Sequence, residues 1–286
     1  METLLLNTLN GLSWGMLLFL IAVGLTTVFG VLGVLNFAHG SLFMLGAYLC
    51  MQTMQLFDSF WVGLLVGPLC TVVIGLLIER YLLKRVYDRD VSYQLLLTFA
   101  VLLILDDAVR MIWGSGYHIV EPPAILSGIV AVAGQDYPVY RLFLILIGPV
   151  IGGLLWAFFH YTKWGKVIRA ASFDNIMAEG VGINVPRLYT AVFALGTWLA
   201  AMGGALAAPQ QSLNPSMGEK IIIESFIVVV VGGMGSFPGA FVGALLLGLL
   251  ESFGTVFAGR MQMAIPYLLL AIILLVKPNG LFRKGV

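Results

Sequence analysis

The sequence contains few charged residues and few of the side chains that soluble enzymes use for chemistry. Asp, Glu, Lys and Arg make up only 10% of its 286 residues, whereas hydrophobic residues make up 60% and the mean hydropathy is +1.01. A soluble domain has about 25% charged residues, so this chain lacks the polar side chains needed to cover a surface that faces water. We therefore expect an all-α polytopic membrane protein, because a helix pairs its own backbone N–H and C=O groups in lipid.

Other absences exclude further classes of function. The net charge of +1 gives no basic surface for a nucleic-acid partner. No G-x-x-x-x-G-K-[ST] phosphate loop and no H-E-x-x-H zinc motif occur, so we expect neither an ATPase site nor a metal site, and no enzyme. Cys50 and Cys70 both lie in apolar segments, where packing is expected rather than a disulfide framework. The first residues lack a basic region and a cleavage motif, so we expect the first apolar run to stay as a membrane segment.

The apolar residues are gathered into nine stretches. Spanning the hydrocarbon core takes about 20 helical residues, so the second and seventh stretches are short and are expected to be broken or re-entrant. We therefore expect eight to nine membrane segments in a single transmembrane domain over residues 1–286. The stretches lie at 12–33, 41–56, 61–82, 93–113, 140–161, 188–208, 220–234, 238–257 and 262–277.

Basic residues predict how the segments are oriented. Lys and Arg cluster at 80–89, 163–187 and 277–284, whereas the loops at 114–139 and 209–219 contain neither. Positively charged loops stay on the cytoplasmic side, so we expect a cytoplasmic C-terminus. Nine crossings then place the N-terminus outside and eight place it inside.

Five charged residues fall within apolar stretches, where an ionisable side chain is a functional candidate by default. Asp106 and Arg110 are spaced i,i+4 and are predicted to pair on one helix face. Asp107 points about 100° away from Asp106 on a helix, which makes the two a poor proton-sharing pair. Glu224 precedes the glycine-rich run "SFIVVVVGGMGSFPG", and Glu251 is expected near the outer interface.

Two apolar stretches are interrupted by glycine and polar residues. Residues 30–48 read "GVLGVLNFAHGSLFMLGAY" and residues 232–248 read "GGMGSFPGAFVGALLLG". Short, Gly- or Pro-interrupted segments in both halves of a transporter indicate a path at the membrane midplane. Three interpretations of "NFAHG" remain open: a turn at the inner face, a metal-binding or catalytic His39 without visible partners, and a broken helix beside a path.

The long inner loop at 162–187 reads "TKWGKVIRAASFDNIMAEGVGINVPR". We expect one short amphipathic helix over 168–183, ended by Gly180 and Gly182, with Pro186 opening the next span. Two roles are open: docking to another protein, or lying on anionic lipid. The apolar positions of this helix are Ile168, Ala171, Ile176 and Ala178.

Three segments carry a family resemblance: "GLTTVFGVLGVLNFAHGSLFMLGAY", "GKVIRAASFDNIMAEGVGINVPR" and "VVGGMGSFPGAFVGALLLGLLES". Together with the closing "PNGLF", they resemble the H-type permease subunits of branched-chain amino-acid ABC importers, nearly end to end. The resemblance implies a single transmembrane permease domain over 1–286 in the bacterial inner membrane. It also implies a heterodimer with a second permease subunit, two cytoplasmic ATP-binding subunits and a periplasmic substrate-binding protein. ATP would then be bound by the partner subunits, and the chain would need no cofactor of its own.

The resemblance and the interrupted segments give two sets of candidate residues. The set matched to the family's ATPase-coupling loop is Arg169, Ala170, Asp174, Ala178, Gly182 and Ile183. The set proposed for the translocation path is Asn36, Phe37, His39, Gly40, Ser41, Glu224, Gly233, Gly235, Ser236, Pro238 and Gly239.

The expected substrate is a branched-chain or similar small hydrophobic amino acid. Related importers carry urea, amides or aromatic acids, and the sequence does not separate these substrates. A second hypothesis is an ion-coupled secondary transporter that uses Glu224 or Asp107 as its ion site.

Overall fold

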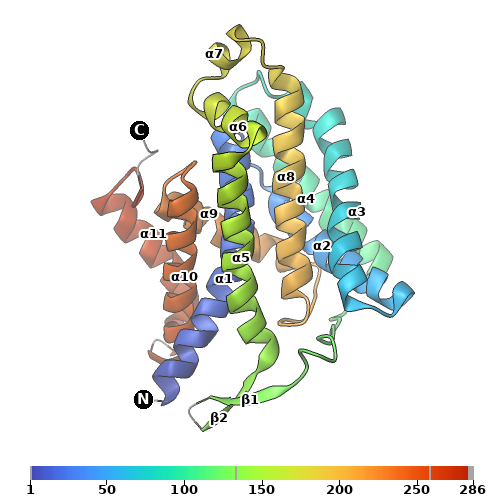
Figure 1. Cartoon of the computed structure of the whole chain (residues 1–286), viewed down its shortest axis with the longest axis vertical. Helices are drawn as coiled ribbons and strands as arrows, with labels where there is room; N and C mark the ends of the chain where they lie inside the picture. Colours follow the sequence, from blue (N-terminus) through green and yellow to red (C-terminus); the bar gives the residue numbers. More distant parts are fainter. Residues whose placement is uncertain (1, 133, 258, 283–286) are drawn as a thin grey trace.

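The structure is a computed structural model that describes residues 2–132, 134–257 and 259–282, and it shows an elongated bundle of helices (Figure 1). The helices that follow the nine predicted apolar stretches are α1 (Glu2–Leu32), α2 (Ala38–Phe57), α3 (Phe60–Tyr81), α4 (Val91–Trp113), α5 (Val139–Tyr161), α8 (Val185–Ala207), α9 (Met217–Gly232), α10 (Phe237–Phe257) and α11 (Ile265–Val276). Shorter pieces are η1 (Leu83–Arg85), α6 (Lys163–Phe173), α7 (Asn175–Gly180) and η2 (Gly259–Ala264).

Five of these helices are long and apolar enough to cross a membrane by length and composition: α1, α3, α5, α8 and α10. α4 has 23 residues but carries three charged side chains. α9 has only 16 residues, as expected for a short segment. α11 has only 12 residues, fewer than the stretch at 262–277 suggested, because η2 occupies the start of that stretch. Pro266 then lies in the first turn of α11, where its missing N–H costs nothing.

The all-α prediction is confirmed for the bundle, and the loop between α4 and α5 adds a β-hairpin that was not predicted. β1 (Ile129–Val132) pairs antiparallel with β2 (Gln135–Pro138), in a register that joins Ile129 to Pro138 and Val132 to Gln135. Gly134 has φ +81 in the connection, a conformation that glycine adopts without strain. The hairpin lies at the same end of the molecule as the start of α1, opposite to α6 and α7 (Figure 1).

α1 forms the centre of the bundle. It packs against α5, α8, α9 and α10, and its residues 17–23 are almost completely buried. Small residues bring α1 and α10 into backbone contact: a Cβ added to Gly11 would lie 2.8 Å from the Cα of Leu249. Close approach through small residues is the usual way that helices associate where lipid removes the hydrophobic driving force.

The segment "NFAHG" is the break in a helix. α1 ends at Leu32, Gly33 takes φ +69, and the chain then runs without helical structure to α2. α2 restarts beside the middle of α1, since the Nε2 atom of His39 lies 3.0 Å from the carbonyl oxygen of Ile21, about three turns before the end of α1. Thr98 of α4 donates to the carbonyl oxygen of Leu35 (3.3 Å) and so satisfies part of the non-helical backbone. The break therefore lies inside the bundle and is not a turn at its end.

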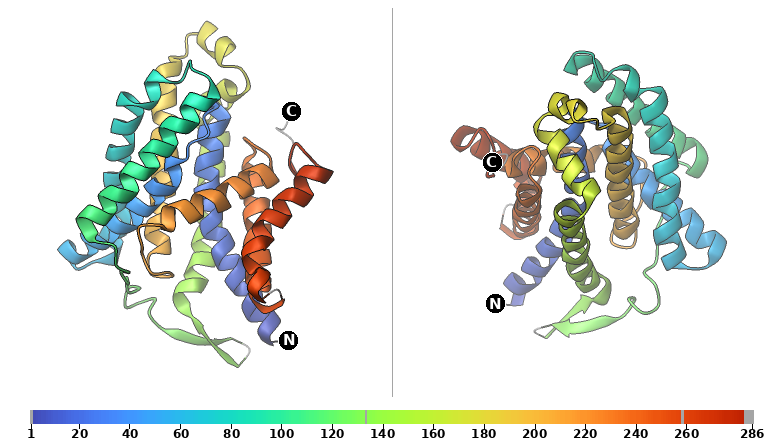
Figure 2. Two further views of the ribbon diagram at one scale, coloured as in Figure 1. Left: turned by 180° about the vertical axis from the view of Figure 1, so that it is seen from behind. Right: turned by 45° about the horizontal axis from the view of Figure 1, so that its top comes forward.

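α9 begins close to the same point. Gly218 in its first turn lies against Gly40 in the first turn of α2. From there α9 runs obliquely across α1, in the space between α4 on one side and α10 and α11 on the other (Figure 2). Two helices thus start side by side within the bundle: α9 with 16 residues, and α2 with 20, which is longer than the second apolar stretch suggested.

The inner loop forms two helices where one was predicted over 168–183. α6 and α7 are separated at Asp174, which has extended backbone angles and accepts a hydrogen bond from the Met177 N–H through its side chain (2.9 Å). An Asp that caps a new helix favours a break over a continuous helix. α7 ends at Gly180, Gly182 has φ +87, and Pro186 lies in the first turn of α8, as predicted.

Candidate functional site

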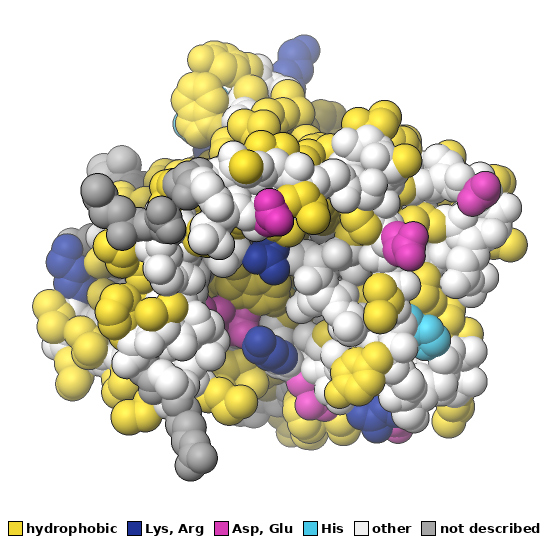
Figure 3. Space-filling model, turned by 90° about the horizontal axis from the view of Figure 1, so that it is seen from below, with side chains coloured by type: hydrophobic (Ala, Val, Ile, Leu, Met, Phe, Trp, Pro, Cys, Tyr) yellow, Lys and Arg dark blue, Asp and Glu magenta, His cyan; other side chains and the backbone are white. Residues whose placement is uncertain are grey.

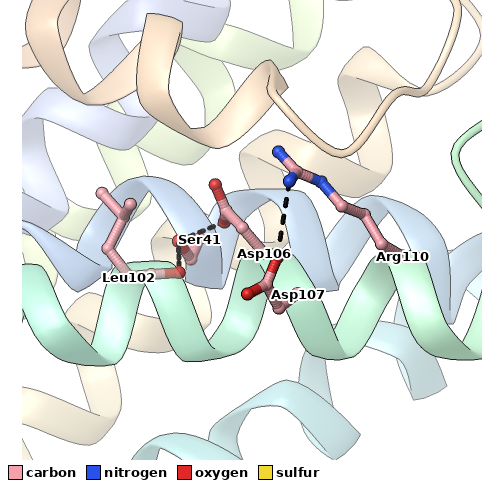
Figure 4. Close-up of polar contacts among 5 residues, drawn as sticks. All are labelled: Ser41, Leu102, Asp106, Asp107 and Arg110. Carbon is pink, nitrogen blue, oxygen red and sulfur yellow. Dashed lines mark hydrogen bonds and ion pairs between the residues drawn. The ribbon is translucent and has the colours of Figure 1, made fainter.

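The centre of the bundle contains a buried contact between α2 and α4. The Ser41 hydroxyl donates to the Oδ1 atom of Asp106 (2.8 Å) and also lies 3.4 Å from the Leu102 carbonyl oxygen (Figure 4). Both Ser41 and Asp106 are buried. The hydroxyl supplies a donor to a carboxylate that has no access to water, which offsets part of the cost of burying it.

The predicted pair of Asp106 and Arg110 is wrong. Arg110 instead contacts Asp107, with 3.4 Å between Nη1 and Oδ1, and both of these side chains are largely exposed (Figure 4). Helical spacing allows both pairs, and packing decides between them: Asp106 is buried against Ser41 of α2, whereas Asp107 and Arg110 are both exposed.

His39 connects the restart of α2 to α1 and α8. Its imidazole contacts the Ile21 carbonyl oxygen. The ring lies beside Gly24 of α1 and Leu199 of α8, where these two helices pack together. Among the described residues no group of three or more His, Cys, Asp or Glu side chains could hold a metal ion. The structure therefore gives His39 a packing and hydrogen-bonding role. Asn36 is fully buried beside it, and neither polar atom of its side chain has a hydrogen-bond partner in the described part of the chain.

Phe37 joins an aromatic cluster that links the broken segment to two helices. Its ring centroid lies 5.1 Å from that of Phe226 on α9 and 6.3 Å from that of Phe99 on α4. Phe226 belongs to a line of residues along the open side of α9, spaced at three or four positions as one face of a helix requires. We call this line the α9 stripe; it consists of Glu219, Ile223, Phe226 and Val230.

Glu224 lies on a different face of α9, towards α1 and α10. It is buried, and its Oε1 atom lies 3.5 Å from the Nζ atom of Lys220 one turn earlier. Trp14 of α1 lies beside this pair, with its ring centroid 5.9 Å from the Nζ atom of Lys220. Sequence reasoning overlooked Lys220 and Trp14, although the i,i+4 spacing of Lys220 and Glu224 is a visible signal.

The second predicted break, at 232–239, forms the turn between α9 and α10. Gly233 and Gly235 have φ +105 and +82, and the Ser236 hydroxyl oxygen accepts from the Gly239 N–H (3.1 Å) at the start of α10. Pro238 follows in the first turn of α10. C-terminal residues close this turn, because the Leu281 and Phe282 N–H groups donate to the last carbonyls of α9 (2.8 and 3.0 Å).

The structure therefore separates the predicted path residues into two groups. Asn36 to Ser41 lie beside the first turns of α9, where Gly40 contacts Gly218 and Ile222. The turn at 233–239 lies at the other end of α9, close to the end of α1. A Cβ added to Gly30 of α1 would lie 3.5 Å from the Cα atom of Gly235. Glu224 lies between these two groups along α9.

The predicted coupling residues lie on the two consecutive helices α6 and α7, which we call the α6–α7 unit, and in the turn that follows them. Asp174 caps α7, Ala178 is buried, and the Ile183 N–H donates to the Ala178 carbonyl oxygen (3.1 Å) after the turn at Gly182. Arg169 and Ala170 lie exposed on α6. Ile168 and Ala171 are buried as expected.

Ile176, predicted as an apolar position of the amphipathic helix, points away from the bundle and is 85% exposed. It belongs to a group of exposed apolar side chains at the end of the molecule. We call this group the α7 tip; it consists of Phe173, Ile176, Met177 and Val181.

A buried carboxylate lies beneath α7 and was missed from the sequence. Glu79 at the end of α3 accepts hydrogen bonds from the Tyr87 hydroxyl and the Thr190 hydroxyl, both at 3.0 Å. Burial and the Glu79 carboxylate raise the pKa of Tyr87 well above its ordinary value, so the phenol keeps its proton and remains a donor. A cavity of about 300 Å³ adjoins this contact and reaches α7 through Asn175 and Glu179.

Seen from the end that contains the β-hairpin, the molecule has a hollow with an apolar floor and Lys, Arg, Asp and Glu side chains around it (Figure 3). Such side chains within a membrane protein face a cavity or a protein partner rather than lipid.

Comparison with known proteins agrees with this arrangement. The family described as "Branched-chain amino acid transport system / permease component" matches residues 7–276. The high-affinity branched-chain amino acid transport system permease protein LivH of Escherichia coli (strain K12) is 28% identical over 291 residues, covering 96% of this chain and 94% of the relative. BraD of Pseudomonas aeruginosa, a permease protein of the same description, is 28% identical over 289 residues, with the same coverage.

A solved structure has a similar fold. PsaBC from Streptococcus pneumoniae, in complex with Fab, superposes with a TM-score of 0.53 at 13% identity and covers 94% of this chain and 91% of that one. At this identity the likeness concerns the fold alone.

Proposed function

Because the chain belongs to the family of permease components of branched-chain amino-acid transport systems, we propose that it forms one half of a heterodimeric permease that carries branched-chain or similar small hydrophobic amino acids across the bacterial inner membrane. A permease component of this kind is a multi-pass membrane protein without its own ATPase site and works with separate ATP-binding subunits. The observation that carries the proposal is the family match over nearly the whole chain, joined to an open helix face with polar and aromatic side chains.

The α9 stripe marks the face on which the second permease subunit packs. It combines a charged residue, Glu219, with Ile223 and Phe226 along one line, and Ile223 is 42% exposed. A charged side chain facing lipid is costly, so this face is better explained by a protein partner and a wet path. The path then runs between the two permease subunits along α9, past Phe37 and the break before α2.

Helices α2 and α9 begin beside this path. Their first turns meet within the bundle, where the preceding backbone is not helical, and such backbone is tolerated at membrane depth only against protein or water. Discontinuous helices of this kind surround the substrate path in several transporter folds. Among the predicted path residues, Phe37 lies on this side, whereas Asn36, His39, Ser41 and Glu224 are buried behind it. The glycine-rich turn at 233–239 fits the inner end of the path.

The α6–α7 unit fits the role of the contact with an ATP-binding subunit. The α7 tip presents four exposed apolar side chains, a group that would otherwise face water on a loop rich in Lys and Arg. Asn175 donates to the Val31 carbonyl oxygen at the end of α1 (3.3 Å), and Glu79 connects α3 and α8 beneath α7. Movement of an ATP-binding subunit would therefore reach α1, α3 and α8 together and change access to the path.

Competition for uptake tests the substrate. The importer, assembled with its second permease subunit, two ATP-binding subunits and binding protein, is reconstituted in proteoliposomes and supplied with ATP and labelled leucine. Unlabelled isoleucine and valine are expected to reduce leucine uptake, whereas urea, acetamide and benzoate at the same concentration leave it unchanged. Strong competition by urea, amide or aromatic acid with none by valine would assign the chain to an importer for those substrates.

A further inference from the structure

We propose that Glu224, Glu251 and Trp14 form a subsite for the ammonium group of the substrate at the outer side of the path, and that Lys220 fills this subsite with its own ammonium group when substrate is absent. The inference rests on the proposed function, because it names the part of the substrate that this region recognises.

Lys220 and Glu224 differ greatly in their access to water. The Lys220 side chain is 75% exposed, whereas that of Glu224 is only 6% exposed, although the two are paired at 3.5 Å. A lysine side chain is long and flexible and can move its charge into water. The Glu224 carboxylate is buried and cannot move into water, so a cation must lie beside it to balance its charge. The ammonium of Lys220 is therefore the exchangeable member of the pair.

The group contains more acidic than basic side chains. Helix α10 packs against α1 at Gly11 and Gly15, on either side of Trp14, which brings Glu251 of α10 close enough to act on the same charges. One lysine therefore serves two acidic residues. The Oε2 atom of Glu224 is also buried without a hydrogen-bond partner among the described residues. A buried carboxylate oxygen without a donor calls for a ligand that brings one, and an ammonium group has three.

Trp14 completes the subsite from α1. Its ring centroid lies 5.9 Å from the Nζ atom of Lys220, within the range of a cation–π interaction. An aromatic face beside carboxylates attracts any ammonium group and has no affinity for an anion. Three helices thus contribute one side chain each to the same place: α1, α9 and α10.

The α9 stripe begins beside this group. Ile223 and Phe226 follow Lys220 along α9, on its open side. A substrate whose ammonium group took the place of the Lys220 Nζ atom would therefore find the exposed side chain of Ile223 about one helical turn, roughly 5 Å, further along the axis. This combination suits a molecule with an ammonium group at one end and an apolar side chain at the other.

Labelling of a cysteine at position 220 tests the inference. In the assembled importer with Cys70→Ala, Lys220→Cys is treated with a cationic and with an anionic methanethiosulfonate of similar size. The ratio of the cationic to the anionic rate is compared with the ratio at Tyr117→Cys, an exposed position in the loop after α4, because a thiolate itself reacts faster with a cationic reagent. The ratio at position 220 is expected to be at least about tenfold larger, because two carboxylates are left without their lysine. Adding Glu224→Gln should reduce that ratio several-fold.

Ile223→Cys, one turn further along the exposed side of α9, serves as a second reporter if the cysteine at 220 prevents assembly. A ratio no larger than that at Tyr117→Cys, or a ratio unchanged by Glu224→Gln, would overturn the subsite. Leucine should slow labelling by the cationic reagent, whereas 4-methylpentanoate, which lacks the ammonium group, should not. A cation preference without protection by leucine would support the subsite and contradict the proposed substrate, which keeps the two conclusions separable.

Discussion

Gly40 in the first turn of α2 lies directly against Gly218 in the first turn of α9, so closely that a Cβ on Gly40 would come within 2.8 Å of the Cβ of Ile222. This contact joins the two helices at the point where both begin. It explains a glycine at a position where the helix has already restarted, since the space is taken by the backbone of α9. The contact also means that α2 and α9 must move together, or separate, when the path changes its access.

Gly40→Ala should destabilise the permease and reduce transport. The added methyl group meets α9 backbone, and overpacking of this kind costs about 1–3 kcal/mol. Thermal unfolding in detergent and ATP-driven uptake measure the two effects. Gly153→Ala on α5 is the matched control, because a Cβ there meets no atom within 4 Å. Equal behaviour of the two variants would show that the Gly40 contact does not constrain the fold.

Asp106→Ala should lower the free energy of unfolding by about 1–3 kcal/mol, because the buried Ser41 hydroxyl loses its acceptor and a cavity is left. Asp107→Ala and Arg110→Ala should each change it by no more than about 0.5–1 kcal/mol, since their ion pair is exposed. Chemical unfolding of the three variants in detergent measures the difference. Similar losses for Asp106→Ala and Arg110→Ala would instead favour the i,i+4 pair that the structure does not contain.

Ile176→Glu should weaken association with the ATP-binding subunits while leaving the permease folded. The side chain is 85% exposed, so the change affects the surface of the α7 tip and not the core. Loss of about tenfold or more in affinity is expected where an apolar contact is replaced by a charge. Ile129→Glu, the same change at an exposed isoleucine on β1, is the control. If both variants purify with the ATP-binding subunits equally well, the α7 tip is not the contact surface.

Asp174→Ala should unfold α7 locally and reduce coupled uptake, because losing an N-cap costs about 1 kcal/mol and α7 has only six residues. Asp174→Asn keeps a capping oxygen and should retain most activity. Amide hydrogen exchange of residues 175–180 reports the effect directly, with faster exchange expected for the alanine variant alone. Faster exchange in both variants would assign Asp174 a role through its charge rather than through capping.

The positions of the helices could be predicted from the sequence because each depends on a local run of apolar residues. The break at "NFAHG" was visible for the same reason, as a polar and glycine-containing interval. Its depth was not predictable, because it depends on His39 contacting Ile21, eighteen positions earlier. The hairpin at 129–138 was also missed, because the alternation of apolar and polar residues in its two strands is short and interrupted.

The partners of the charged residues depend on the packing of distant helices. Asp106 has a polar neighbour of opposite charge one turn away in Arg110, yet its partner is Ser41, 65 positions away. Glu79 behaves similarly, with Thr190 supplied by α8. Helical spacing alone identifies which residues can meet on one helix but not which face is turned towards a neighbour.

Uptake of labelled leucine into proteoliposomes, with and without ATP and with and without the partner subunits, tests the central claim most directly. Uptake is expected only when ATP, both ATP-binding subunits, the second permease subunit and the binding protein are all present. Ion-gradient-driven uptake by this chain alone, insensitive to ATP, would contradict it and would identify an ion-coupled transporter instead.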